Sequence, residues 1–326
     1  MNRRNFLTTL GVYLPLSLSF GTGVASAAQA QCQAPDNELD SATFAQPQPP
    51  YLQRYQYDQH PQNFFDLRIP EGEGRYPLAI LIHGGYWRSK YDLQYLSHLA
   101  AALTKMGIAS ANIEYRRVGD VGGGYPGTFL DVANCIDRLP QIIRDAKLEQ
   151  RIDLNNIVLI GHSAGGHLAA WAASRASIDR QSVLFSENAT PTAGFISLAG
   201  VLDLDYAIAH HLSDNAALGL LIGPSEVANY AQMPPDKMAE FRQIISNTSP
   251  AAMLPVKTKA YLVHGMMDDS VPMDTNRFYY QDAIEHEMDV YYQIIECAGH
   301  FDIVDPQSPH FSEVEKVITL AFAGHR

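Results

Sequence analysis

The serine at position 163 lies in a pattern that makes a hydroxyl group chemically accessible. The segment VLIGHSAGGHLAAW places Gly161-His162-Ser163-Ala164-Gly165 directly between a predicted strand and a predicted helix. In this G-x-S-x-G turn, side chains two residues before and after the serine would collide, so glycine is needed at both places. The turn exposes the hydroxyl above the N-terminus of the helix. An ordinary Gly/Ser turn is the alternative, but the flanking strand and helix favour a nucleophile.

A serine hydroxyl is a weak nucleophile at neutral pH, so it needs a base and an acid that orients the base. Two later loops offer them. VHGMMDDSVP follows a predicted strand and contains Asp268 and Asp269, and ECAGHFDIVDP follows the last predicted strand and contains His300. The chain order serine, aspartate, histidine is the order of α/β-hydrolases. His83 and His264 also end strands, and we expect them to brace their loops through hydrogen bonds.

The segment ILIHGGYWRSK, residues 80–90, ends an apolar run in two glycines and two aromatic residues. Acyl transfer places negative charge on the substrate carbonyl oxygen, and backbone N–H groups aimed at that oxygen lower the barrier. Glycine allows such close approach of the backbone. We therefore expect Gly84, Gly85 and Ala164 to form an oxyanion hole. Tyr86 and Trp87 either wall the substrate pocket or anchor the loop in the core.

The elements that must position these residues alternate between strands and helices. Such alternation predicts a mostly parallel sheet covered by helices on both faces, with the ligand site at the carboxyl ends of the strands. A hydrophobic content of 46% allows a large core for one domain at 51–326. We expect strands near 63–70, 78–83, 108–114, 156–162, 193–200, 260–265 and 290–295, and helices near 93–107, 129–147, 164–174, between the last two strands, and at 311–323.

One long segment, at about 206–259, interrupts this alternation. It contains Gly223-Pro224, Pro234-Pro235 and a helical stretch around 236–246. An insertion of this length is typical of a cap over the site, although a packing excursion without a role in substrate binding is equally compatible with the sequence.

The N-terminus predicts export. Residues 1–30 combine a basic start, an apolar stretch and Ala-x-Ala cleavage sites that end at Ala27 and Ala30. Arg3 and Arg4 resemble a bacterial twin-arginine signal, although a generic basic start is the alternative. The apolar stretch is short and interrupted, so we expect no retained membrane anchor and a periplasmic or secreted protein.

Residues 31–50 are rich in proline and glutamine and are predicted to be a linker. Removal of the signal leaves 21 basic and 35 acidic residues, a net charge of −14, which argues against a nucleic-acid partner.

Cys32, Cys135 and Cys297 are too few for a disulfide scaffold or a zinc site, and free buried thiols are favoured over a single bridge. No metal site is expected at His210-His211, which has no further ligand at suitable spacing.

Four ordered motifs carry a family resemblance over residues 51–325. HGGYW (83–87), GHSAGGHLA (161–169), HGxxDxxVP (264–272) and GHFD (299–302) resemble the α/β-hydrolases of the BD-FAE and kynurenine formamidase group. The resemblance implies a cofactor-free serine hydrolase with the triad Ser163, Asp268 and His300, and it favours Asp268 over Asp269. It also implies that Glu114, Arg116, Arg117 and Asp131 form structural ion pairs.

The leading functional hypothesis is hydrolysis of a small carboxylic ester. The nearest alternative is cleavage of an aryl formamide such as N-formylkynurenine, because HGGYW is the motif of formamidases. Gly166 stands where those enzymes more often have alanine, and an export signal is unusual for cytoplasmic tryptophan catabolism. A peptidase related to prolyl oligopeptidase would need a longer chain. A non-catalytic binding protein is the alternative from another class, and such proteins commonly lack a triad member. Oligomeric state is not predicted.

Overall fold

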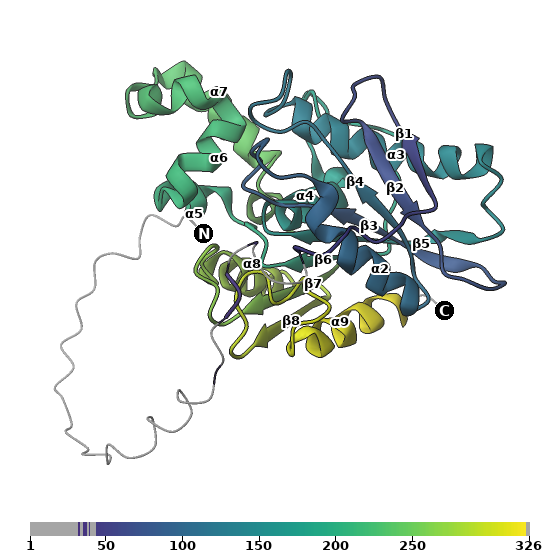
Figure 1. The fold of residues 1–326 in the computed structure, drawn as a ribbon. Coiled ribbons are helices and arrows are strands. Elements are labelled where there is room, and N and C mark those ends of the chain that lie inside the picture. Colours follow the sequence, from purple (N-terminus) through teal and green to yellow (C-terminus); the bar gives the residue numbers. More distant parts are fainter. Residues whose placement is uncertain (1–31, 33–34, 38, 40–43, 324–326) are drawn as a thin grey trace, which may run out of the picture. The chain divides into compact units, whose positions relative to one another are not determined.

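The computed structural model describes residues 32, 35–37, 39 and 44–323. The predicted export signal at 1–30 lies outside these residues. The described chain forms an eight-stranded sheet in the order β1-β2-β4-β3-β5-β6-β7-β8, with helices on both faces (Figure 1). The strands are β1 (Gln53–Gln56), β2 (Phe64–Arg68), β3 (Tyr76–Ile82), β4 (Ala109–Ile113), β5 (Ile152–His162), β6 (Gly194–Leu198), β7 (Lys259–Gly265) and β8 (Val290–Ile295).

The pairings β1–β2 and β2–β4 are antiparallel, and the pairings from β4 through β8 are parallel. The expectation of a mostly parallel sheet is therefore confirmed, and β1 is the strand that the sequence pattern missed. The principal helices are α2 (Ser97–Lys105), α3 (Gly127–Asp145), α4 (Ala164–Ala173), α8 (Asp274–Glu285) and α9 (Phe311–Ala323), together with the short 3₁₀ helices η2 (Leu93–Leu96) and η3 (Arg175–Ser177).

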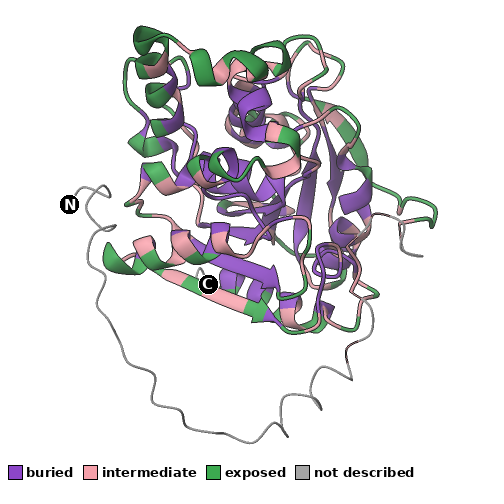
Figure 2. Ribbon diagram, turned by 90° about the vertical axis from the view of Figure 1, so that its left-hand side faces the viewer, coloured by how far each residue is buried: buried purple, intermediate pink, exposed green. Residues whose placement is uncertain are grey.

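The central strands are apolar on both faces because both faces are covered. In β3, Leu78 and Ile80 pack with the helices α3, α4 and α8, whereas Ala79 and Leu81 pack with α2 and α9. Successive residues of a strand point to opposite faces, so a strand buried on both sides is an uninterrupted apolar run rather than an alternating one. Figure 2 shows buried residues concentrated on these strands. This arrangement fixes the carboxyl ends of β3, β5, β7 and β8 at one edge.

The expected insertion between β6 and β7 is a group of helices. It comprises α5 (Leu204–Ala209), α6 (Leu212–Ile222), η4 (Pro224–Gln232), α7 (Pro235–Ser246) and η5 (Pro250–Met253). The insertion contacts the loop after β3. The guanidinium of Arg88, in that loop, donates to the hydroxyl of Ser213, in α6, at 3.0 Å and to the Ser213 carbonyl. In this group His210 stacks on Tyr206, and His211 hydrogen-bonds Asn215, which gives each histidine a local partner.

Two expectations about the N-terminal part and the cysteines need correction. The predicted linker at 31–50 contains residues that pack on the folded body: Leu39 and Phe44 contact the core under α2 and α9, and the Asp36 N–H donates to Asp302 at 2.8 Å. Polar composition concealed these contacts. The sequence favours free thiols, but Cys32 and Cys297 are each disulfide-bonded, and Cys135 is free and buried.

Among the described residues, no helix combines the length and the apolar character that a membrane crossing requires.

Candidate active site

Ser163 occupies a strained turn between β5 and α4. Its backbone angles are φ 57° and ψ −123°, a region that residues other than glycine rarely adopt. A Cβ at Gly161 would lie 2.0 Å from the Gly165 carbonyl oxygen, and a Cβ at Gly165 would lie 2.0 Å from the Ile82 carbonyl oxygen. Glycine is therefore required at both positions by sterics. The Ser163 N–H donates to the Leu198 carbonyl at 2.8 Å, which ties the turn to β6.

Asp268 and His300 contact each other directly. The Nδ1 of His300 donates to the Oδ2 of Asp268 at 2.7 Å, and the Asp268 side chain is only 1% exposed. The other carboxylate oxygen of Asp268 accepts the N–H groups of Ser270 and Val271, both at 2.8 Å. Burial alone would raise the pKa of Asp268, but the hydrogen bonds from His264 and His300 outweigh burial and hold this pKa well below its usual value. Asp268 is therefore a carboxylate at neutral pH.

Asp269, the rival acid, does not contact His300. It is exposed and lines the cavity described below. His264, which was expected to brace its loop, does so: its Nε2 donates to the Val271 carbonyl at 3.0 Å and lies 3.3 Å from the Oδ2 of Asp268. Asp268 thus has two histidines on the same oxygen, and the loop after β7 is held around it.

A cavity of about 380 Å³ opens where these loops meet. Both Ser163 and His300 line it. Within the described chain, no hydrogen bond joins the Ser163 hydroxyl to the His300 ring, and the Nε2 of His300 has no partner. Catalytic hydrogen bonds are often long or misaligned before substrate binds. The other lining residues are Asn37, Leu39, Gly85, Tyr86, Tyr91, Tyr95, His162, Ser213, Asp269, Ser270 and Phe301.

The loop after β3 approaches the serine turn closely. A Cβ at Gly84 would lie 2.6 Å from the His162 carbonyl oxygen and 2.8 Å from the Ser163 Cβ, so only glycine fits. The Gly84 N–H, however, donates to the Tyr95 hydroxyl. Its expected place in an oxyanion hole therefore conflicts with this contact, because the N–H already has an acceptor.

Three other N–H groups remain available. Gly85 and Tyr86 line the cavity, and Gly85, Tyr86 and Trp87 all have positive φ angles, of 102°, 49° and 57°. In the part of the chain that the structure describes, the N–H groups of Gly85, Tyr86 and Ala164 have no hydrogen-bond acceptor. Backbone N–H groups without an acceptor inside the protein can donate hydrogen bonds to a bound anion.

The two aromatic residues of this loop have different roles. Tyr86 lines the cavity, and its hydroxyl donates to the Ser270 carbonyl. Trp87 is fully buried, and its Nε1 donates to the Nδ1 of His167 at 3.2 Å. Burial lowers the pKa of His167 to about 4, which keeps this acceptor neutral. Trp87 therefore anchors the loop, and its predicted role as a substrate-binding residue is corrected because its side chain does not reach the cavity.

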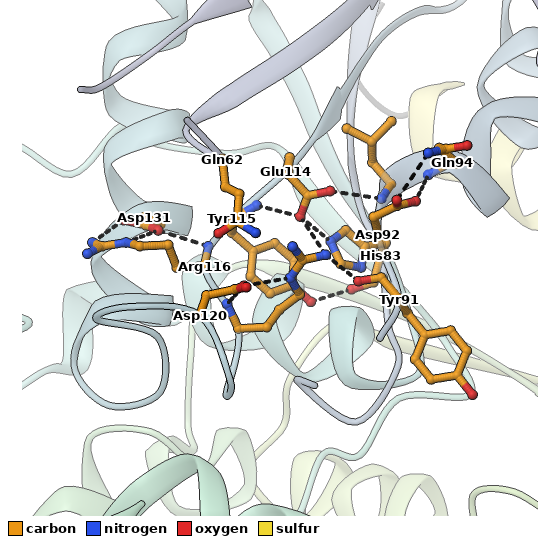
Figure 3. A network of polar contacts seen from close by, with 12 residues as sticks. Gln62, His83, Tyr91, Asp92, Gln94, Glu114, Tyr115, Arg116, Asp120 and Asp131 are labelled. Atoms are coloured by element: carbon orange, nitrogen blue, oxygen red, sulfur yellow. Dashed lines mark hydrogen bonds and ion pairs between the residues drawn. The ribbon is translucent and has the colours of Figure 1, made fainter. Parts of the chain in front are cut away.

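A buried polar network braces the same loop from behind (Figure 3). Glu114 accepts from the Nε2 of His83 at 3.0 Å and from the Leu93 N–H at 3.1 Å, and it pairs with Arg117 at 3.1 Å. Arg116 makes a two-pronged pair with Asp131 at 2.8 and 2.7 Å. The expectation that these four charged residues form structural ion pairs is confirmed.

Sequence patterns missed two residues of the site, Tyr95 and Asn37. The Tyr95 hydroxyl accepts from Gly84 and bonds the Nδ1 of His162 at 3.0 Å, and the Nε2 of His162 donates to the His300 carbonyl at 3.0 Å. Asn37 bonds the His300 N–H at 2.8 Å. No local motif signals either residue, because each acts through contacts between distant segments.

Comparison with known proteins agrees with this architecture. The family model BD-FAE matches residues 65–282. A probable isoprenylcysteine alpha-carbonyl methylesterase of Oryza sativa subsp. japonica is 25% identical over 227 residues, covering 68% of this chain and 50% of that protein. The corresponding methylesterase of Arabidopsis thaliana is 24% identical over 235 residues, covering 70% and 51%. The chain thus spans about half the length of these curated relatives.

Solved structures show the same fold at low identity. Esterase B from Lactobacillus Rhamnosis has a TM-score of 0.66 and 19% identity, covering 83% of this chain and 84% of that one. A truncated carbohydrate esterase from gut microbiota has a TM-score of 0.63 and 19% identity, covering 83% and 97%.

The network in Figure 3 predicts that Glu114 is a major contributor to stability. Glu114→Ala leaves His83, Arg117 and the Leu93 N–H without their shared acceptor inside the protein. We expect the free energy of unfolding, measured by urea denaturation, to fall by about 3 kcal/mol. The exposed pair of Arg180 and Glu187 is the control, because Glu187→Ala should cost less than about 1 kcal/mol. Equal costs for the two variants would contradict this role.

Proposed function

Because the chain belongs to the BD-FAE family of α/β-hydrolases, we propose that it is a serine hydrolase that cleaves carboxylic esters through a Ser163-His300-Asp268 triad. The observation that carries the proposal is the pairing of His300 with buried Asp268, 2.7 Å apart, on a cavity that Ser163 also lines. This pairing fixes the Nδ1 proton of His300 and leaves Nε2 as the basic nitrogen. The strained turn presents the serine hydroxyl to the same space.

In the proposed reaction, the Nε2 of His300 takes the proton of the Ser163 hydroxyl as its oxygen attacks the ester carbonyl carbon. The imidazolium then returns this proton to the leaving alcohol, and the acyl group stays on Ser163. A water molecule then gives a proton to the same nitrogen and attacks the acyl carbon, so that the bond between this carbon and the Ser163 oxygen breaks and the acid leaves. The imidazolium returns the proton to the Ser163 oxygen. Asp268 remains ionised throughout and stabilises the imidazolium.

We assign the oxyanion hole to the N–H groups of Gly85, Tyr86 and Ala164. The absence of an acceptor for these three groups in the described chain supports this assignment. Gly84 contributes differently: its missing side chain makes room for Ser163, and its N–H is held by Tyr95. The positive φ of Tyr86 is strain of the kind that is tolerated where function requires it.

The lining of the cavity favours an ester without negative charge. Its described residues include no lysine or arginine, and Asp269 adds a carboxylate at its edge. N-formylkynurenine carries an amino-acid carboxylate, for which this lining offers no cationic partner. The names of the relatives, methylesterases and a carbohydrate esterase, also point to esters. An aryl formamide remains the alternative to be assayed beside esters.

We also propose that the protein is exported. The basic and apolar pattern of residues 1–30 supports this proposal, and so does the disulfide-bonded state of Cys32 and Cys297, since disulfides persist outside the reducing cytosol. Fractionation of bacterial cells should recover a processed chain outside the cytoplasm, and Arg3→Lys with Arg4→Lys should retain the precursor inside. An unprocessed cytoplasmic wild-type chain would refute export.

Ser163→Ala tests the nucleophile. It should reduce kcat on a chromogenic acetyl ester by roughly 10⁴ or more, without lowering the melting temperature, because it removes only the attacking oxygen. The wild type should react with a fluorophosphonate probe and the variant should not. Assays of N-formylkynurenine beside the ester separate the two substrate classes. A wild type that neither reacts with the probe nor hydrolyses either substrate would favour a non-catalytic binding protein.

The neighbouring acids provide a matched pair. Asp268→Asn should lower kcat by at least about 10³, because the His300 ring loses the carboxylate that orients it. Asp269→Asn changes the same chemical group one residue away and should lower kcat by less than about tenfold. Both are measured on the same ester, with circular dichroism to verify folding. A larger loss for Asp269→Asn would transfer the acid role to Asp269.

A further inference from the structure

We propose that Asn37 is a positioning residue that fixes the catalytic histidine and the acid loop relative to each other. Sequence patterns placed Asn37 in a linker, and no motif includes it. Its side chain nevertheless bonds both loops that carry the acid and the base. The proposal rests on the function proposed above. Asn37 also lines the cavity, and the proposal concerns its hydrogen bonds to the loops of His300 and Asp268 rather than a contact with the substrate.

Three hydrogen bonds of one amide group carry the inference. The Oδ1 of Asn37 accepts the His300 N–H at 2.8 Å and the Asp269 N–H at 3.3 Å. Its Nδ2 donates to the Met267 carbonyl at 3.0 Å. Met267 and Asp269 flank Asp268 in the loop after β7, whereas His300 belongs to the loop after β8. A single amide therefore joins the backbone on both sides of the acid to the backbone of the base.

The adjoining backbone is docked in the same place. The Asp36 carbonyl accepts the Phe301 N–H at 2.8 Å, and the Asp36 N–H donates to the Oδ2 of Asp302, which also accepts the Gly299 N–H at 2.8 Å. A Cβ at Gly299 would lie 2.6 Å from the Asp36 carbonyl oxygen and 2.8 Å from the Oδ1 of Asn37. Glycine at 299 thus provides the space that residues 36–37 occupy beside the base.

Both backbone polar groups of His300, its N–H and its carbonyl, are therefore hydrogen-bonded to side chains. Asn37 accepts its N–H, and His162 donates to its carbonyl at 3.0 Å. The acid and base loops also contact each other directly, through the Met267 N–H and the Ala298 carbonyl at 3.0 Å. That bond does not involve Asp268 or His300 themselves. Asn37 adds a link to the backbone of His300 itself and to both neighbours of Asp268. Small displacements of catalytic groups cost large factors in rate.

Asn37 is only partly buried, so its replacement should leave the fold intact. Asn37→Leu preserves the approximate volume and removes all three hydrogen bonds, and Asn37→Ala removes them without adding apolar bulk. We expect both variants of the full mature chain to lose about tenfold in kcat on the chromogenic ester, with KM changed by less than about twofold. Fluorophosphonate labelling of Ser163 should slow in parallel. Asn188→Ala, at an exposed site, should leave all these rates unchanged.

A purely structural role would lower the melting temperature and leave kcat per folded molecule unchanged. Amide hydrogen exchange adds a readout independent of activity, since the His300 N–H should exchange faster when its acceptor is removed. Unchanged kcat in both variants, or a loss confined to Asn37→Leu, would overturn the proposal. Failure of the triad itself is distinguishable, because Ser163→Ala would then keep its activity.

Discussion

The steric constraint at the serine turn governs the rest of this structure. Ser163 adopts φ 57° only because Gly161 and Gly165 allow backbone atoms to approach where a Cβ would lie 2.0 Å from a carbonyl oxygen. Gly84 extends the same constraint to the neighbouring loop, whose backbone fits against the turn. A backbone conformation of this cost persists only when its surroundings determine it fully. The parallel strands on either side of β5, buried on both faces, supply that rigidity and set the edge where the loops converge.

Around this rigid turn, electrostatics is arranged to keep one carboxylate charged and one imidazole oriented. Asp268 is buried, which opposes ionisation, yet two backbone N–H groups and two histidines bond it. The result is a buried charge that is fully hydrogen-bonded rather than an isolated one. Glu114 solves the same problem behind the glycine loop by accepting from His83 and pairing with Arg117. The two buried carboxylates, Asp268 and Glu114, thus hold the loops after β7 and β3 in place through hydrogen bonds.

Sequence patterns predicted the strands and the serine turn, because these features depend on residues that are close together in the chain. The apolar runs became β2 to β8, and the glycine spacing around Ser163 placed the turn correctly, because strand burial and steric collision are encoded in neighbouring residues. The acceptor of the Gly84 N–H and the docking of Asn37 escaped prediction, and the sequence left open whether Trp87 anchors the loop or lines the pocket. Each depends on contacts between segments far apart in the chain, and the polar composition of 31–50 gave no hint that part of it packs against the body.

The contact between Asn37 and His300 spans 263 positions of the chain. During synthesis, residue 37 leaves the ribosome long before residue 300 exists, so the loop of the base can adopt its final geometry only after nearly the whole polypeptide has been made. A nascent chain therefore has its serine turn in sequence but no assembled pair of acid and base. On the function proposed above, hydrolytic activity would therefore depend on a nearly complete polypeptide chain.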